Sequence, residues 1–137
     1  MGPRIVITFG TFDLYHIGHL NLLKRAKEYG DYLIVGVSSD RLNMSKKQRR
    51  PIYSYSERKR ILETTNFVDE VFMEDSLEKK REYLLQHRAD ILIMGDDWKG
   101  KFDEFSDICK VVYLPRTKGI SSTDVIQKIS QMSDSSK

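Results

Sequence analysis

The sequence contains very little cysteine, histidine and proline. Its 137 residues include one cysteine, Cys109, together with three histidines and three prolines. A single cysteine excludes an internal disulfide framework and a cysteine-rich metal site, so the reducing cytoplasm is the expected compartment. The chain has no proline-rich linker and no internal repeat, which favours one domain over several.

Long hydrophobic runs are also missing. The first apolar run, residues 5–9, is short and follows one basic residue, so it predicts a strand rather than a signal peptide. No later run approaches the length that spans a bilayer, and we therefore expect no membrane partner. A hydrophobic content of 39% suits one ordinary core. We expect a domain over residues 1–130 and a flexible, serine-rich tail over residues 131–137.

The excess of positive charge is small. The formal net charge is +3, and basic residues gather at 46–50, 58–60 and 79–81. These clusters lack the interleaved aromatic residues of a stacking platform, so we expect no nucleic-acid partner. Small phosphorylated ligands fit the clusters better, although a solvated charged surface explains the second and third clusters equally well.

Strand-like and helix-like patterns alternate along the chain. Strands are expected at residues 5–9, 32–37, 70–73, 91–94 and 111–114, and helices at 20–26, 55–65, 77–86 and 123–129. The segment between Asp40 and Tyr53 is expected to be a loop. This order predicts an α/β, Rossmann-like single domain with a central five-stranded parallel sheet and helices on both faces. In such sheets, ligands bind beyond the carboxyl ends of the strands.

The stretch Gly10–His19 joins the first expected strand to the first helix. A helix N-terminus presents unpaired N–H groups to an anion, and glycines allow a ligand to approach the backbone closely. His16 and His19 are three residues apart, which places both imidazoles on one side of the first helical turn. We therefore expect this turn to hold a phosphate. Helix capping, packing and a zinc pair are the alternatives, and zinc is disfavoured because His87 is the only other histidine.

A second anion-binding turn is expected after the last strand. Arg116 supplies positive charge there, and hydroxyl groups at the start of the closing helix lie where bare N–H groups can meet phosphate. The residues of this turn are Arg116, Thr117, Gly119, Ile120, Ser121, Ser122 and Thr123. A simple helix cap is the alternative for the Ser-Ser-Thr sequence. Turns after the second and fourth expected strands, at residues 38–40 and 95–97, should converge with these two on one edge of the sheet.

Three segments carry a resemblance to a known family. Gly10–His19 resembles the GTFDLxHxGH form of the HxGH motif of cytidylyltransferases, within the nucleotidyltransferase superfamily. Residues 94–103 and 113–123 are similar to segments of the small glycerol-3-phosphate cytidylyltransferases, and the resemblance covers Arg4 to Ile129. It implies transfer of the cytidylyl group of CTP to glycerol 3-phosphate, giving CDP-glycerol and pyrophosphate, for the synthesis of teichoic-acid or capsule-type polymers. It also implies a homodimer, and Mg²⁺ held mainly by CTP and water without direct ligation by the protein.

The resemblance assigns roles residue by residue. The catalytic residues would be His16, His19, Lys46 and Arg116, and the acceptor phosphate would be bound by Lys46, Arg58 and Lys80. CTP would be bound by Gly10, Thr11, Phe12, Asp13, His16, Gly18, His19, Arg49, Asp97, Trp98, Arg116, Thr117, Gly119, Ile120, Ser121, Ser122 and Thr123.

Several of these assignments leave alternatives open. Asp13 would either orient a histidine or cap the helix. Asp97 and Trp98 would form the nucleoside pocket, or else a plain turn with Trp98 in the core. The loop over residues 40–53 is one residue longer than in typical members, so Lys47 and Arg50 compete with Arg49 for the contact to CTP. Asn66 stands where family members commonly have arginine, so the role of that arginine is either lost or shifted to another residue such as Arg58.

Cytidylyl transfer needs no protein nucleophile and no strong base, because the attacking phosphate oxygen is already an anion. It needs two polyanions to be positioned and their charge to be stabilised. One alternative keeps the fold but changes the substrates, to another phospho-alcohol or to ATP as the nucleotide donor. A second alternative, of another class, is a nucleotide-binding regulator that has lost turnover.

Overall fold

The fold is a five-stranded parallel sheet with helices on both faces. A computed structural model describes residues 2–117 and 121–135. Its strands are β1 (Ile5–Gly10), β2 (Tyr32–Ser38), β3 (Glu70–Glu74), β4 (Ile91–Gly95) and β5 (Lys110–Leu114). They are arranged in the order β3-β2-β1-β4-β5, and every neighbouring pair is parallel. The expected fold class is confirmed, and the strand ends differ from the expected ones by one residue.

Alternation along the strands builds two hydrophobic cores, one on each face of the sheet. Val6 packs with Leu23 of the first helix and Leu62 of the third, whereas its neighbour Ile7 packs with Leu84 of the fourth. Side chains of adjacent strand residues point to opposite faces, so each strand contributes to both cores. All five of these side chains are almost fully buried, and burial of both faces of the sheet explains the continuous apolar runs of the sequence.

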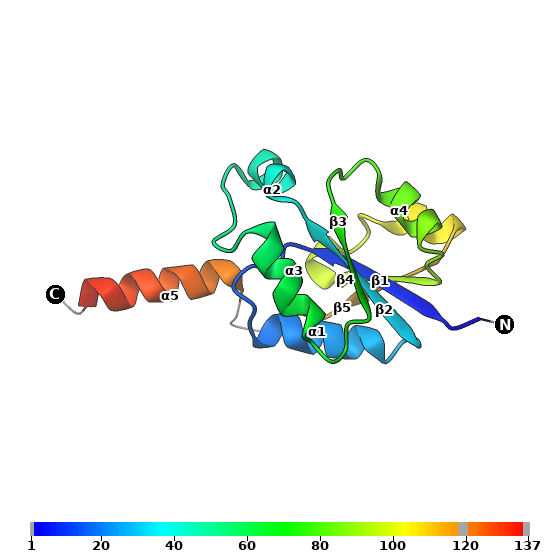
Figure 1. The fold of residues 1–137 in the computed structure, drawn as a ribbon, viewed down its shortest axis with the longest axis horizontal. Helices are drawn as coiled ribbons and strands as arrows, with labels where there is room; N and C mark the ends of the chain where they lie inside the picture. Colours follow the sequence, from blue (N-terminus) through cyan, green and yellow to red (C-terminus); the bar gives the residue numbers. More distant parts are fainter. Residues whose placement is uncertain (1, 118–120, 136–137) are drawn as a thin grey trace.

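The helices cover both faces of the sheet (Figure 1). They are α1 (Ile17–Lys27), α2 (Asp40–Lys47), α3 (Tyr55–Glu63), α4 (Lys80–Gln86) and α5 (Ser122–Ser135), with two short 3-10 turns, η1 (Asp96–Trp98) and η2 (Asp103–Asp107). Helices α1 and α3 pack on one face, and α4 and η2 pack on the other. Among residues 2–117 and 121–135, no helix is long and apolar enough to cross a membrane.

Local sequence signals fix where the helices begin. Ser54 caps α3: its hydroxyl accepts a hydrogen bond from the N–H of Glu57, and the Glu57 carboxylate accepts one from the N–H of Ser54. The two hydrogen bonds form a capping box. Ser39 caps α2 by accepting a hydrogen bond from the N–H of Leu42 at 3.1 Å. Ser121 accepts a hydrogen bond from the N–H of Asp124 at 3.0 Å at the start of α5.

Two expected segments differ in the structure. The expected loop over residues 40–53 contains α2, which sequence periodicity missed because the helix is short and carries only two large apolar side chains, Leu42 and Met44. Helix α5 continues to Ser135 and takes in most of the expected tail. It extends away from the body of the domain in Figure 1. The flexibility of the tail and the boundary at residue 130 remain predictions.

Candidate functional site

A cavity of about 600 Å³ lies at the carboxyl ends of the strands. The turns after β1, β4 and β5 contribute to its wall, together with α2, the helix that follows β2, whereas residues 38–40 are not among the described lining residues. Because all neighbouring strands are parallel, the four turns lie at one edge of the sheet, as expected. The described residues of the expected CTP site that line it are Gly10, Thr11, Phe12, Asp13, His16, Gly18, His19, Arg49, Asp97, Trp98, Arg116, Thr117, Ser121, Ser122 and Thr123. Gly119 and Ile120 lie outside the described residues. This is the edge at which parallel α/β sheets bind ligands.

The turn after β1 has an unusual backbone. Phe12 and Leu14 adopt φ angles of 53° and 48°, a left-handed conformation that costs about 1–3 kcal/mol for residues with a side chain. The ring of Phe12 is 5% exposed and joins the core beneath α1 and α3, which offsets part of this cost. The turn therefore delivers His16 to the N-cap of α1 in a fixed position.

The two histidines cap the helix and face the cavity at the same time. Nδ1 of His16 accepts a hydrogen bond from the N–H of Gly18 at 3.1 Å, and Nδ1 of His19 accepts one from the N–H of His16 at 3.2 Å. Their rings stack with centroids 3.8 Å apart. Because each neutral ring accepts through Nδ1, its proton is on Nε2. Nε2 of His16 is buried and has no hydrogen-bond partner among the described residues.

Both histidines are held in the neutral form. Burial lowers the pKa of His16 below its ordinary value, and the positive charge of Arg116 lowers it further. Burial lowers the pKa of His19 to about 3, with smaller contributions from the charges of His16 and Lys47. At neutral pH the pair therefore offers Nε2–H donors beside the positive end of the α1 dipole, rather than two formal charges.

Asp13 takes neither of its two expected roles. Its carboxylate accepts hydrogen bonds from the backbone N–H groups of Ile52 and Tyr53, at 2.6 and 2.9 Å, and from Leu14 at 3.1 Å. It thus fastens the segment after α2 to the turn after β1. It neither caps α1 nor bonds a histidine in the described structure, although it does line the cavity. Sequence spacing offered no signal for contacts between residues so far apart.

Arg58 also differs from the expectation, because it is fully buried rather than free to bind an acceptor phosphate. Its guanidinium donates to the carbonyl oxygens of Thr11, Ser38 and Tyr53 at 2.8–3.0 Å. It also pairs with Asp40 at 2.7 Å. The side chain therefore ties the turn after β1 to the turn after β2.

Asn66, which stands where family members commonly have arginine, does not lie at the cavity either. It is exposed after α3 and is absent from the described wall of the cavity. Neither Arg58 nor Asn66 is therefore among the described residues that line the cavity.

The turn after β5 is attached to the N-terminal turn by polar contacts. The amide of Asn21 on α1 donates to Oγ1 of Thr117 at 3.0 Å, and the hydroxyl of Ser122 donates to the backbone carbonyl of Asp13. Arg116 is exposed on the wall of the cavity, close enough for its charge to lower the pKa of His16. The two expected anion-binding turns therefore form one continuous wall.

Asp97 and Trp98 belong to η1, after β4. Trp98 is 43% exposed, so the alternative that placed it in the core is wrong. Its ring lies beside that of Phe102, with centroids 5.7 Å apart, and the ammonium group of Lys101 lies 5.5 Å from its centroid. An exposed aromatic face next to a carboxylate is suited to stacking and reading a nucleoside base.

The lysines expected at the acceptor line the cavity from α2 and α4, and α4 packs on the face of the sheet opposite to α1. We call this part of the lining the opposite wall. Lys46, in the last turn of α2, is partly buried, and burial lowers its pKa despite the opposing charge of Glu74. Lys80 begins α4 and is 5% exposed. Lys47 and Arg49 line the cavity, whereas Arg50 is not among the described lining residues.

Sequence reasoning missed two buried polar residues of this wall, Asn43 and Glu74. The amide of Asn43 donates to the hydroxyl of Ser38 at 2.8 Å, and its carbonyl accepts from the hydroxyl of Thr11 at 2.9 Å. Glu74 ends β3 and lies 3.1 Å from Nζ of Lys80. The expected strand ended at residue 73, one residue short of Glu74, so the position of Glu74 at the ligand edge was not recognised.

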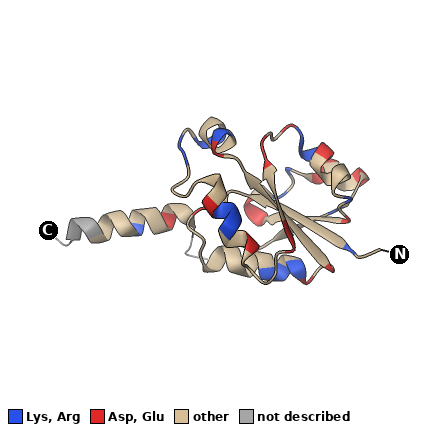
Figure 2. Ribbon diagram, viewed as in Figure 1, with Lys and Arg blue, Asp and Glu red and all other residues tan. Residues whose placement is uncertain are grey.

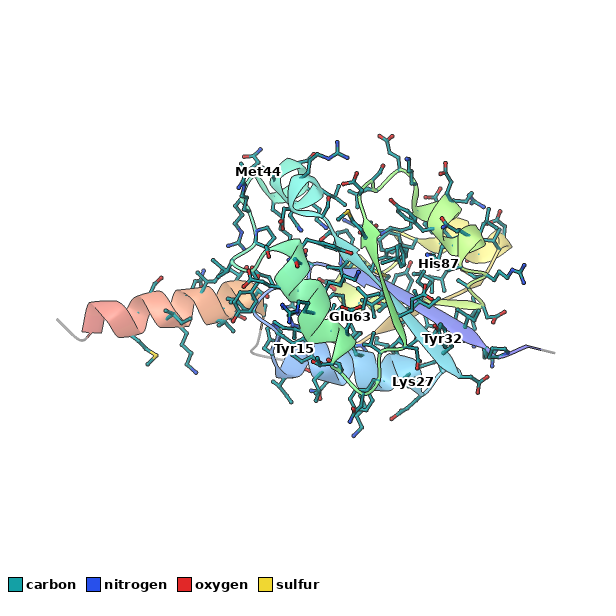
Figure 3. The ribbon with its side chains drawn as sticks, in the orientation of Figure 1. Tyr15, Lys27, Tyr32, Met44, Glu63 and His87 are labelled. Carbon is teal, nitrogen blue, oxygen red and sulfur yellow. The ribbon has the colours of Figure 1, made fainter. Side chains whose placement is uncertain are left out.

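The remaining histidine lies apart from the pair. His87 follows α4, where Nδ1 lies 3.3 Å from a carboxylate oxygen of Glu70 and the ring packs on Phe72 (Figure 3). In the part of the chain that the structure describes, no three His, Cys, Asp or Glu side chains are grouped as a metal site. The three basic clusters lie on or next to three different helices, α2, α3 and α4 (Figure 2).

Comparisons with known proteins give a consistent result. A family model described as cytidylyltransferase-like matches residues 7–128. The chain is 53% identical over 124 residues to a protein of Bacillus subtilis (strain 168) named glycerol-3-phosphate cytidylyltransferase, covering 90% of this chain and 95% of that one. It is 45% identical over 124 residues to the Staphylococcus aureus protein of the same name, covering 90% and 93%. The solved structure of a lipopolysaccharide core biosynthesis protein from Thermoplasma volcanium GSS1 has a TM-score of 0.75 at 25% identity, covering 85% of this chain and 100% of that one.

Proposed function

This chain belongs to the cytidylyltransferase-like family, and on that basis we propose that it transfers the cytidylyl group of CTP to glycerol 3-phosphate. A phosphate oxygen of the acceptor forms a bond to the α-phosphorus of CTP. The bond between the α-phosphorus and the bridging oxygen to the β-phosphate breaks, so that pyrophosphate leaves and CDP-glycerol forms. The observation that carries the proposal is the convergence of the neutral histidine pair, Arg116 and two lysines on one cavity.

The two walls of the cavity suit the two substrates. We propose that one wall binds the phosphates of CTP. Its donors are the N-terminus of α1, the Nε2–H groups of His16 and His19, and the guanidinium of Arg116. Donors that are already oriented stabilise charge that grows on phosphate oxygens during the reaction. Lys46 and Lys80 line the same cavity from α2 and α4 and are suited to hold the acceptor phosphate.

The histidines need not move a proton in this reaction. The acceptor phosphate is already an anion, and the lowered pKa of each histidine keeps it a hydrogen-bond donor through Nε2. Asp97 and Trp98, after β4, lie where the cytosine ring could stack and its amine could donate to a carboxylate. These assignments divide the site into phosphate, base and acceptor regions.

We expect Mg²⁺ to enter with CTP. The described carboxylates do not form a cluster that could hold the ion alone, which suits a metal bound mainly by phosphate oxygens and water. When bound, the ion would neutralise charge on the triphosphate and the leaving pyrophosphate. We also propose that the protein acts in the cytoplasm as a homodimer, and that its product, CDP-glycerol, is used to make teichoic-acid or capsule-type polymers.

A direct assay tests the proposed function. Purified protein with CTP, Mg²⁺ and glycerol 3-phosphate is expected to release pyrophosphate and to give a product with the mass of CDP-glycerol. Parallel reactions replace CTP with ATP, or glycerol 3-phosphate with other phospho-alcohols, and compare kcat/KM. A higher kcat/KM for another combination of nucleotide and acceptor would show that the proposed substrates are wrong and would identify the preferred ones. Tight CTP binding without pyrophosphate release from any pair would overturn catalysis and favour a nucleotide-binding regulator.

A further inference from the structure

Glu74 is a buried carboxylate in a cavity that otherwise gathers positive charge. It is the last residue of β3 and pairs in register with Ser38 of β2, while its carbonyl accepts a hydrogen bond from the N–H of Ser39 at 2.9 Å. The residue is 1% exposed and belongs to the wall of the cavity. Figure 1 shows this end of β3 between α2 and α4, the helices that carry Lys46 and Lys80.

The carboxylate has acceptor capacity that the described residues leave unused. Its one ion-pair partner among them is Lys80, with Nζ 3.1 Å from Oε2, and Oε2 has no hydrogen bond of good geometry. An ionised carboxylate can accept about four hydrogen bonds, and buried polar groups in proteins are nearly always satisfied. A buried acceptor of this kind, in the wall of a ligand cavity, points to a donor that a ligand supplies.

Lys80 is held in place by more than its charge. Its ammonium group lies 4.3 Å from the ring centroid of Phe9 and 4.7 Å from that of Phe102. These rings and the exposed side chain of Leu77 give the subsite apolar surface next to the two charges. Such a lining suits a short carbon chain, while Lys80 and Lys46 suit a phosphate.

The balance of charge selects the kind of group that Glu74 would meet. A ligand ammonium group would be attracted by this carboxylate but repelled by Lys80 and Lys46, whose charges lie on the same wall. A hydroxyl group carries no charge, donates one hydrogen bond and accepts others, so it fits between a carboxylate and a lysine. The site therefore favours a neutral hydroxylated chain over an amino alcohol.

We propose that Glu74 determines the specificity for the acceptor: it accepts a hydrogen bond from a hydroxyl group of a small polyol phosphate, while Lys46 and Lys80 bind the phosphate. This inference rests on the proposed transferase function and deepens it. Glu74 is a binding residue for the part of the acceptor that does not react. Its loss should therefore weaken discrimination between acceptors rather than the use of CTP.

The test compares three acceptors with the wild-type protein. Glycerol 3-phosphate carries two free hydroxyl groups, propyl phosphate carries none, and phosphoethanolamine replaces the hydroxyls with an ammonium group. Loss of a hydrogen bond to a charged group lowers kcat/KM by about 10–100-fold. The kcat/KM for glycerol 3-phosphate is therefore expected to be at least about 10-fold higher than the values for propyl phosphate and phosphoethanolamine. Equal kcat/KM values for glycerol 3-phosphate and propyl phosphate would overturn the inference without any variant.

Variants assign the selectivity to the carboxylate. Glu74→Leu is expected to lower kcat/KM for glycerol 3-phosphate about 10–100-fold, and to lower kcat/KM for propyl phosphate far less. The kcat/KM of Glu74→Gln for glycerol 3-phosphate should lie between the values of the wild-type protein and Glu74→Leu. Glu78→Gln removes an exposed carboxylate nearby in the chain and should retain the wild-type selectivity. Equal losses for both acceptors in both Glu74 variants would show a structural role only and would contradict the inference.

Two further outcomes keep this test separate from that of the proposed function. If Glu74→Leu does not fold, the selectivity of the wild-type protein and of Glu74→Gln decides the question. If the wild-type protein forms no cytidylyl product with any of the three acceptors, the proposed function fails first. Product with propyl phosphate at the same efficiency as with glycerol 3-phosphate would leave the transferase intact and reject the role of Glu74.

Discussion

The two walls of the cavity, which we propose bind the phosphates of the two substrates, have opposite electrostatic characters. On the α1 wall, His16 and His19 are neutral because burial and neighbouring positive charges lower their pKa. On the opposite wall, Lys80 is more deeply buried but lies beside Glu74, whose charge opposes the lowering of its pKa by burial. A helix N-terminus supplies positive potential to the first wall, so neutral donors suffice there. Lys80 itself begins the shorter helix α4, and on this wall formal charges, rather than neutral side chains, face the cavity.

This difference suggests distinct roles for the walls. Neutral donors on a helix N-terminus are oriented before the substrate arrives and need no counterion. A lysine held against a carboxylate keeps its position in the free protein and can share its charge with an arriving anion. The first arrangement suits growing charge in the transition state, and the second suits recognition of the acceptor. Substitutions can separate these two roles.

The largest expected effect concerns Arg58, which connects the two walls. Arg58→Ala should lower the free energy of unfolding by about 3–5 kcal/mol, because buried carbonyl groups lose their donors and Asp40 loses its partner. Urea denaturation measures this loss. Arg60→Ala, an exposed position on the same helix, is the matched control and should change stability little. A stable Arg58→Ala protein with a raised KM for the acceptor would instead restore the expected role at the phosphate.

The next effect separates helix capping from catalysis on the α1 wall. Asparagine is a good N-cap residue but lacks the Nε2–H of histidine, so His16→Asn should fold normally and lose about 10²–10³ in kcat. Steady-state kinetics and thermal denaturation measure the two consequences. His16→Ala should lose the same activity and, in addition, about 1 kcal/mol of stability. Wild-type turnover in His16→Asn would leave the histidine with a capping role only.

A smaller loss is expected on the opposite wall. Lys80→Met should lower kcat/KM for glycerol 3-phosphate about 10–100-fold, because the acceptor phosphate loses a charged donor. The Kd for CTP should stay within about twofold if the walls act independently. Isothermal titration and initial rates measure the two quantities. Lys79→Met, at an exposed neighbour, is the control. A parallel loss of CTP affinity would show that the walls are not separate.

The fold and the ligand-binding edge of the sheet could be predicted from the sequence, whereas the roles of several polar residues in the two walls could not. Alternating apolar segments and the Gly10–His19 turn were sufficient to predict the sheet and the edge at which ligands bind. The roles of Asp13 and Arg58 were not predictable, since they depend on backbone groups 39–47 positions away in the chain. Glu74 was missed because the expected strand ended one residue before it, and a strand boundary leaves a weak signal in the sequence. Polar contacts between distant residues leave no periodic signal along a sequence.

The smallest effect is the dependence of stability on pH. The pKa of His19 is about 3 in the folded protein and near 6.5 in the unfolded chain, so the unfolded chain binds more protons between these values. The contribution of His19 to stability is therefore complete above pH 6.5 and is lost as the pH falls toward 3. Between pH 7 and pH 5.5 the loss should be on the order of 1 kcal/mol.

The matched variant for this effect is His19→Gln, because glutamine can keep the bond to the N–H of His16 but does not titrate. Urea denaturation at pH 7 and pH 5.5 should show a smaller loss of stability in the variant than in the wild-type protein. An identical loss in both proteins would mean that His19 is not kept neutral by the fold. The α1 wall would then bind phosphate with formal charge, as the opposite wall does, and the contrast between the two walls would disappear.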